Sequence, residues 1–203
     1  MDIKDGIIHI KEQPNKGIHI SDLFFADIFS PPTIVGSAAL NIDKSLFAEP
    51  FMAHFVEVEV DIETGKIKVL RYVAAHDSGK VINPEVTENQ VYGGAFQGCG
   101  LALVEDLVFD ERSGAVLNPN YVDYKILRAL DLPDPEVIFE EVIDPVGPFG
   151  VKGLGEAPLN PTIAAVVQAI HNAIGVRFNK VPVTGDMVLK ALKSKVTEYG
   201  YDT

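Results

Sequence analysis

The sequence has very little cysteine: among 203 residues there is only Cys99. A lone cysteine cannot form a disulfide within the chain, and it cannot supply the several thiolates of a structural zinc site or of a protein-held iron–sulfur cluster. We therefore expect neither centre on this chain, and a reducing, cytoplasmic location.

Basic side chains are also scarce. Lysine and arginine total 17 against 29 aspartates and glutamates, which gives a formal net charge of -12. Such a charge repels the phosphate backbone of nucleic acids and the anionic surface of membranes. The first residues, MDIKDGIIHIKEQ, contain acidic side chains and no long apolar run, so they match neither a signal peptide nor a membrane span. The sequence thus argues against nucleic acids and membranes as partners.

Apolar residues are abundant, at 47% of the chain, which is typical of a folded protein. A strand is predicted at 6–10, a second strand fits 18–20, and a short helix is predicted from Ser21. The clearest pattern is a β-hairpin. One face of the first strand carries Met52, His54, Val56, Val58, Val60 and Ile62, and for much of its length the other face is acidic, with Glu57, Glu59 and Asp61. The turn ETGK follows, and IKVLRYVAA returns as the second strand.

A helix is predicted from Pro84 to about Asp106, although it contains glycines at 93, 94, 98 and 100. Each glycine costs up to about 1 kcal/mol of intrinsic helix stability. The usual compensation is a close neighbour, either a packed backbone or a bound ligand.

The remaining elements complete an α+β chain with mixed sheets, a β-hairpin and packed helices. Strands that suggest a second sheet region, and two helices, are expected at 107–110, 115–117, 136–143, about 159–174 and about 184–194. The whole of 1–203 is interpreted as one region, with two small lobes of about 1–105 and 106–203 as a possible subdivision.

The stretch GVKGLGEAPLNP, residues 150–161, places one carboxylate, Glu156, between a glycine-rich turn and a helix N-terminus. Glycines at 150, 153 and 155 permit positive φ angles and close approach by another group. One interpretation is that Glu156 only stabilises the helix N-terminus. The other is that Glu156 is a general base held on a rigid loop.

A second pattern lies in the glycine-containing helix, where Gln90 and Gln97 stand at helical spacing around Gly93 and Gly94. Amides that both donate and accept suit a polar heterocyclic ligand such as a pterin or a base. The alternative is a glycine face packed on another helix, with solvated glutamines. The series GGAFQGCG lacks the GxGxxG spacing of a dinucleotide fingerprint.

The third pattern is HDSGKVINP, which follows the hairpin with His76 and Asp77 at the end of a strand. A charge-paired base and a loop aspartate bonded to its own backbone are both compatible with this pattern, and the second is the more common case. The other histidines form no HxH or HxxxH pair, so structural roles are favoured over metal binding: these are His9, His19, His54 and His171.

Taken together, three stretches in this order resemble the C-terminal part of the molybdopterin-binding subunit of the xanthine dehydrogenase and aldehyde oxidase family. They are the hairpin through HDSGKVINP, then NQVYGGAFQGCGLALVED, and then GVKGLGEAPLNPTIAAVVQAIHNAIG, which is followed by PVTGDMVLKAL. The resemblance covers nearly the whole chain, and its specificity lies in the order and spacing of the pieces.

The resemblance implies an oxidoreductase of the molybdenum hydroxylase type, in which Glu156 is the active-site glutamate that takes up a proton as water-derived oxygen is transferred to the substrate. It implies that Gln90 hydrogen-bonds the molybdopterin cofactor. It also implies that Gly153, Leu154 and Gly155, with Lys152 before them, form the loop that presents the glutamate. The pterin holds the molybdenum in this family, so no metal ligand is expected from this chain.

The same resemblance implies molybdopterin, with a cytosine dinucleotide form as one option, while iron–sulfur clusters and FAD belong to partner domains or subunits. The implied partners are the remainder of the molybdopterin-binding subunit, the iron–sulfur and flavin subunits, and a small-molecule substrate, with an N-heterocycle favoured over an aldehyde. A non-catalytic assembly module and a truncated fragment are the alternatives.

Overall fold

The computed structural model describes residues 2–24, 35–39 and 48–199, and the chain divides into two compact units, Met1–Ile42 and Asp43–Thr203. This division differs from the subdivision near residue 105 suggested by the sequence, because the helix that ends there packs with elements from the second half of the chain. No helix among the described residues is long and apolar enough to cross a bilayer.

The first unit is a small antiparallel sheet in the order β1-β2-β3, followed by a short helix. Its elements are β1 (Asp2–Lys4), β2 (Ile7–Ile10), β3 (Gln13–His19) and α1 (Ile20–Phe24). The predicted strands at 6–10 and 18–20 correspond to β2 and the end of β3. The helix predicted from Ser21 corresponds to α1, which starts one residue earlier, at Ile20, and residues 25–34 lie outside the described residues.

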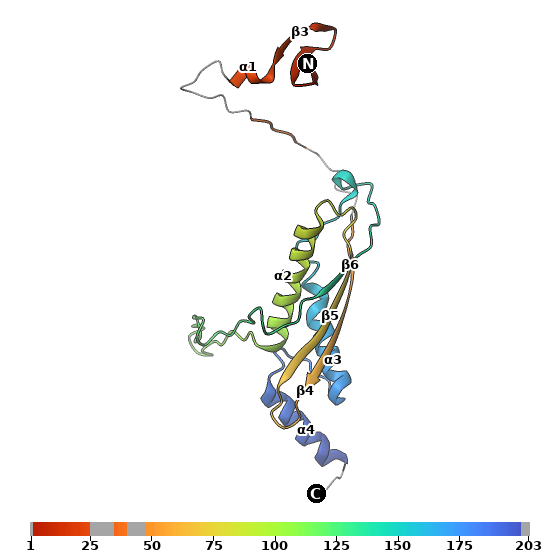
Figure 1. The fold of residues 1–203 in the computed structure, drawn as a ribbon. Helices are drawn as coiled ribbons and strands as arrows, with labels where there is room; N and C mark the ends of the chain where they lie inside the picture. The colour runs from red at the N-terminus through yellow and green to blue at the C-terminus, as the bar shows by residue number, and fades with distance from the viewer. Residues whose placement is uncertain (1, 25–34, 40–47, 200–203) are drawn as a thin grey trace. The chain divides into compact units, whose positions relative to one another are not determined.

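The second unit is built on one three-stranded sheet, with helices packed against it (Figure 1). The sheet contains β4 (Phe51–Val60), β5 (Ile67–Asp77) and β6 (Glu136–Phe139), in that order. The helical elements are α2 (Pro84–Leu103), the 3-10 turn η1 (Pro148–Gly150), α3 (Asn160–Ile174) and α4 (Gly185–Tyr199). The predicted α+β class and the predicted β-hairpin are confirmed, and the predicted helices are found with shifted ends.

The prediction of a second sheet region after residue 106 is wrong. Residues 136–139 pair in parallel with β5 and extend the hairpin sheet, while Phe109 and Val116 form only an isolated bridge. A local pattern shows that a segment is extended, but it does not show which strand will be its neighbour.

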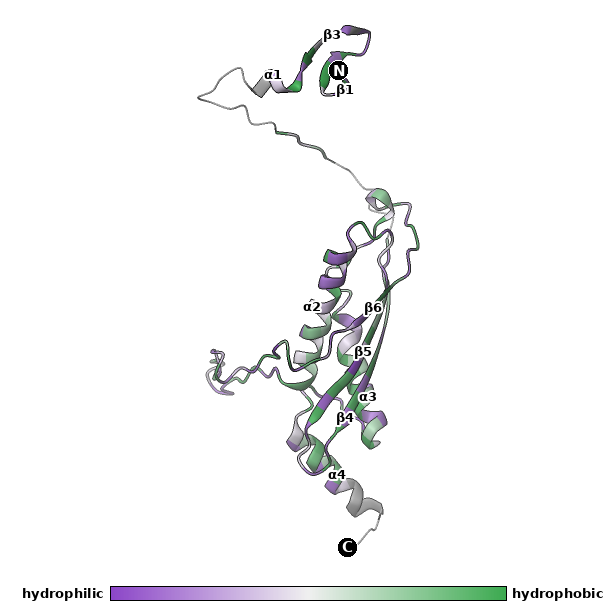
Figure 2. Cartoon of the chain, in the orientation of Figure 1, coloured by the Kyte–Doolittle hydropathy of each residue, from purple (hydrophilic) through white to green (hydrophobic). Residues whose placement is uncertain are grey.

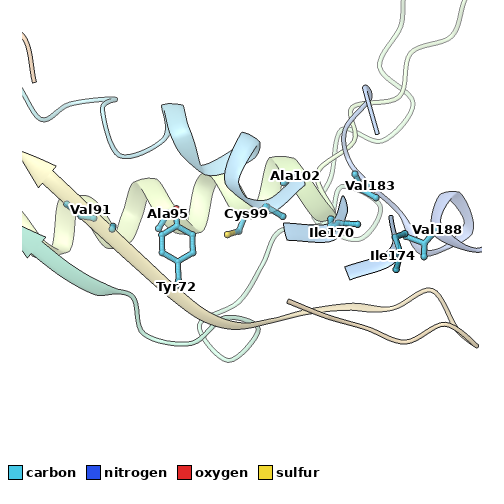
Figure 3. Packing of buried hydrophobic residues seen from close by; sticks show 11 residues of the cluster. Tyr72, Val91, Ala95, Cys99, Ala102, Ile170, Ile174, Val183 and Val188 are labelled. Carbon is cyan, nitrogen blue, oxygen red and sulfur yellow. The ribbon is translucent and has the colours of Figure 1, made fainter. Parts of the chain in front are cut away.

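The core lies between the sheet and α2 and α3 (Figure 3). Residues along β4 alternate between exposed and half-buried, and the hydropathy colouring of the hairpin in Figure 2 shows the same kind of alternation. The buried cluster draws on β5, α2, α3 and the C-terminal segment: Tyr72, Ala74, Val91, Ala95, Cys99, Ala102, Val166, Ile170, Ile174, Val183 and Val188. Burying this apolar surface is the main favourable term that holds the helices on the sheet.

The glycines of α2 fall into two groups. A Cβ atom at Gly94 would overlap Pro158, and one at Gly98 would overlap Thr162, so the absence of side chains there lets α2 approach the start of α3. At Gly93, by contrast, a Cβ atom would meet nothing within 4 Å, and this residue is exposed. At Gly94 and Gly98, close packing against the start of α3 therefore compensates for the helix stability that glycine costs.

A buried chain of hydrogen bonds ties α3 to the sheet. Because Pro158 O can only accept, the Thr162 hydroxyl donates to it (2.9 Å), and the Tyr72 hydroxyl must then donate to Thr162 Oγ1 (2.7 Å). His54 Nδ1 therefore donates to the Tyr72 oxygen (2.7 Å), and His54 Nε2 accepts from His76 Nε2 (2.8 Å). This order requires His54 to be neutral and His76 to carry a proton on Nε2, and it leaves buried His76 Nδ1 without a partner among the described residues.

Alanine at the two kinds of glycine should have opposite effects on stability. We expect Gly98→Ala to lower the free energy of unfolding by about 1–3 kcal/mol, because the added methyl overlaps Thr162. Gly93→Ala, the matched control, should raise it by up to about 1 kcal/mol through helix propensity alone. Urea denaturation of the full chain measures both values, and equal stability of the two variants would contradict the packing described here.

The histidine pair should make the chain less stable as the pH falls. Burial, together with the charge of His76, lowers the pKa of His54 to about 4, and burial also lowers the pKa of His76. A lowered histidine pKa favours the folded state fully above the unfolded value near 6.5, and this contribution is lost between that value and 4. From His54 alone, the full shift would give a loss of about 2 kcal/mol between about pH 7.5 and 5, and because solvent screens this half-buried side chain we expect about 1 kcal/mol.

Denaturation of the full chain at a series of pH values tests this expectation. His54→Gln should be less stable at neutral pH and show a shallower loss on acidification. His171→Gln, which changes a histidine outside the network, should keep the slope of the unmodified chain. An unchanged slope in His54→Gln would assign the pH dependence to other groups.

Candidate active site

Glu156 lies on the loop between η1 and α3, with its side chain exposed. Its backbone oxygen accepts hydrogen bonds from Leu159 N (3.0 Å) and Asn160 N (3.3 Å), so the turn into α3 is built from its main chain. The N-terminal residue of α3 receives no side-chain cap, and the Glu156 carboxylate has no hydrogen-bond partner among the described residues. Glu156 therefore makes no side-chain hydrogen bond to the helix, and stabilisation of the helix N-terminus by its charge stays a prediction.

The glycines before Glu156 serve different purposes. Gly150 takes a left-handed φ of 84°, which the sequence predicted, but Gly153 and Gly155 have no positive φ. Both are exposed, and a Cβ atom on either would meet nothing within 4 Å. Between them, Leu154 is half-buried and packs against the core. The loop is thus attached on its inner side and open on its outer side.

Gln90 contacts this loop directly. Its Nε2 donates to Gly155 O (2.6 Å), which brings the residue predicted to bind the cofactor next to the residue predicted to be the base. Gln90, Gly93 and Gln97 are all exposed, and their spacing places them on one face of α2. This hydrogen bond could not be predicted from the sequence, since Gln90 and Gly155 are 65 positions apart.

The end of β5 holds the other side of the loop. Lys152 N donates to Ser78 O (2.8 Å) and Lys80 N donates to Gly150 O (2.9 Å), which forms a short antiparallel bridge at Gly79. Gly79 has a φ of 65°, and a Cβ atom there would overlap Gly150 O. Only glycine fits this close contact without strain.

Asp77 and Lys152 form an ion pair (2.5 Å) in which both side chains are about nine-tenths buried. Asp77 also accepts a hydrogen bond from Gly79 N (3.0 Å), so the interpretation of Asp77 as a loop aspartate bonded to its own backbone is confirmed, while its ion pair with Lys152 was not predicted from the sequence. Burial by itself would raise the pKa of Asp77, but hydrogen bonds from Lys152 and Gly79 outweigh it and hold that pKa below its usual range. The carboxylate is therefore ionised at neutral pH.

A separate cavity of about 670 Å³ lies at the other end of α2 and shares no residue with the Glu156 loop. Its lining is largely apolar, with a few basic side chains, and includes Ile67, Val69, Leu103, Leu127, Arg128 and Val183. The two glutamines and Glu156 take no part in it.

Comparison with known proteins places this arrangement in a family. Residues 1–133 match the model of the molybdopterin cofactor-binding domain. The xanthine dehydrogenase molybdenum-binding subunit of Escherichia coli O157:H7 is 38% identical over 184 residues, which cover 90% of this chain and 24% of that protein. The aldehyde oxidoreductase of Megalodesulfovibrio gigas is 32% identical over 202 residues, which cover 94% of this chain and 22% of that protein.

Among solved structures, quinoline 2-oxidoreductase from Pseudomonas putida 86 matches with a TM-score of 0.73 at 31% identity, covering 95% of this chain and 25% of that one. The chain thus spans about a quarter of the length of the relatives that it matches. On the family match, the identities and the shared fold, the chain belongs to the molybdopterin cofactor-binding domain family and corresponds to part of the molybdenum-binding subunit found in xanthine dehydrogenases and aldehyde oxidoreductases.

Proposed function

We propose that the chain supplies the general base and part of the cofactor pocket of a molybdenum hydroxylase, with Glu156 as the base. The observation that carries the proposal is the exposed Glu156 carboxylate, which stands on a loop fixed by Gln90 and by the end of β5. A base must be held in position and yet be reachable by the substrate, and this loop meets both conditions.

The residues on the open side fit a flat, polar cofactor such as molybdopterin. Gly93, Gly153 and Gly155 leave the backbone open, since a Cβ atom at each would meet nothing within 4 Å. Gln90 still has one N–H to donate, and its Oε1 accepts no hydrogen bond from the described residues. Gln90, with the exposed amide of Gln97, would hold the pterin, and Gly153, Leu154 and Gly155 would line its approach to Glu156.

When bound, the molybdenum cofactor supplies the two-electron redox chemistry. Glu156 takes up a proton at a carboxylate oxygen while water-derived oxygen is transferred to an electron-poor carbon of the substrate. Its backbone stays fixed through Leu159 and Asn160, so the proton transfer needs no rearrangement of the loop. General-base catalysis of this kind contributes about 10²- to 10⁴-fold to a rate.

The favoured substrate is an N-heterocycle. Xanthine and quinoline, named in two of the relatives, are nitrogen heterocycles with electron-poor carbons. An aldehyde is the second candidate, because aldehyde oxidoreductase subunits reach 36% identity to this chain. Both classes present a carbon that a water-derived oxygen can attack.

The proposed complex contains the remainder of the molybdopterin-binding subunit together with iron–sulfur and flavin domains or subunits, in the cytoplasm. Several relatives are named as subunits or chains of larger complexes, which supports a multi-component enzyme. The pterin is proposed in either its simple or its cytosine dinucleotide form.

Changing Glu156 to glutamine in the assembled enzyme tests the proposal. Glutamine keeps the size of the side chain but cannot accept the proton, so we expect kcat to fall by about 10²- to 10⁴-fold with unchanged molybdenum content. Turnover of an N-heterocycle such as xanthine, followed together with metal analysis, measures both quantities.

Glu111→Gln serves as the control, because this exposed carboxylate lies in a turn away from the loop. It should leave turnover unchanged. Full activity of the Glu156→Gln enzyme would refute the catalytic role and favour an assembly module.

A further inference from the structure

We propose that the buried ion pair between Asp77 and Lys152 is a positioning device that sets the conformation of the Glu156 loop. The inference deepens the proposed function and rests on it for its catalytic meaning. Its structural part concerns only contacts within this chain and can be tested without turnover.

The ion pair is unusual for its burial. The side chains of Lys152 and Asp77 are 6% and 10% exposed, whereas the neighbouring pair of Lys80 and Glu141 is 48% and 36% exposed. Desolvation makes a buried pair a poor source of net stability, and an apolar pair of similar size often does as well. In such a place the two charges add a defined geometry, because each has one partner of opposite charge among the described residues.

The ion pair joins the Glu156 loop to the end of β5. Lys152 lies four residues before Glu156 on the same loop, and Asp77 is the last residue of β5. The Lys152 ammonium also lies 5.7 Å from the centre of the Phe51 ring, so its surroundings come from both hairpin strands. The pair therefore links the loop to the most extensive strand pairing in the second unit.

The other attachments of the loop involve its backbone. Gln90 bonds Gly155 O, and Thr162 bonds Pro158 O, so the loop is held at its middle and at its far end. At its near end, the backbone bridge at Gly79 sets the path of the chain, but it does not fix the rotamer of the Lys152 side chain. Asp77 fixes that rotamer, which restricts how the following glycines can turn.

This assigns a positioning role to Asp77 and Lys152, since neither is exposed enough to act on a substrate. Displacing a catalytic group by about 1 Å can cost about 100-fold in rate. A change at the ion pair should therefore reach the reaction through the placement of Glu156, with the cofactor still bound.

Amide hydrogen exchange of the full chain by NMR tests the structural part. The probes are the amides of Lys152 and Leu159, which donate to Ser78 O and Glu156 O and so report on both ends of the loop. In Asp77→Asn we expect both amides to exchange at least about tenfold faster. Lys80→Met, which breaks the exposed pair nearby, should leave the Leu159 amide unchanged.

Two further variants separate positioning from stability. In Asp77→Asn/Lys152→Met neither charge is left unpaired, so global stability should recover relative to Asp77→Asn while the loop amides still exchange fast. Lys152→Arg keeps the charge and should keep the protection of Leu159. Loop protection that recovers together with stability in the double variant, or that never changes in Asp77→Asn, would overturn the inference.

The assembled enzyme provides the catalytic readout. Asp77→Asn should lower kcat by about 10- to 100-fold with little change in KM and in molybdenum content. Full turnover by Glu156→Gln would refute the proposed function alone, and the exchange rates would still decide the role of the pair. Unchanged kcat in Asp77→Asn, alongside a large loss in Glu156→Gln, would refute positioning alone.

Discussion

The close approach of α2 to the segment 155–162 is the constraint on which the rest of the second unit depends. Three contacts recur at steps of four residues on α2: Gln90 meets Gly155, Gly94 meets Pro158, and Gly98 meets Thr162. The two glycines give up helix propensity so that the backbones can lie side by side. Because the segment enters α3 here, the same contact sets where Glu156 leaves the core.

The sheet completes the attachment through polar groups. Tyr72 and the histidine pair hold Thr162, while Asp77 and Gly79 hold the loop on the other side of Glu156. All five residues come from β4, β5 or the turn that follows β5, so the hairpin serves as the rigid part against which the loop is placed. A buried network that is satisfied at nearly every member is costly to rearrange, which suits a catalytic group that must not move.

The sequence pattern predicted the features of the fold that depend mainly on residues close together in the chain. The hairpin, the helices and the position of Glu156 before α3 followed from alternation, turn residues and prolines. The parallel pairing of β6 with β5 could not be predicted, because sequence alternation does not identify a strand's neighbour. The Asp77–Lys152 pair spans 75 positions, and nothing in either segment distinguishes a buried charge from a solvated one. Likewise, Gly93 and Gly94 look alike in the sequence, yet only Gly94 faces α3.

The asymmetry of the Glu156 loop explains how one chain can contribute to a site that it does not enclose. Asp77, Gly79 and Thr162 hold the loop on its inner side and the exposed Gln90 holds it at Gly155, while a Cβ atom at Gly153 or Gly155 would meet nothing within 4 Å and the Glu156 carboxylate remains exposed. A loop that depended on its cofactor for order would have to be ordered at each assembly, and binding would carry that entropic cost. Here the contacts with the hairpin and α2 order the loop when the chain folds, before the cofactor binds. The open side can then be shaped by the larger part of the subunit that the relatives contain, which fits a family whose named members act on different substrates.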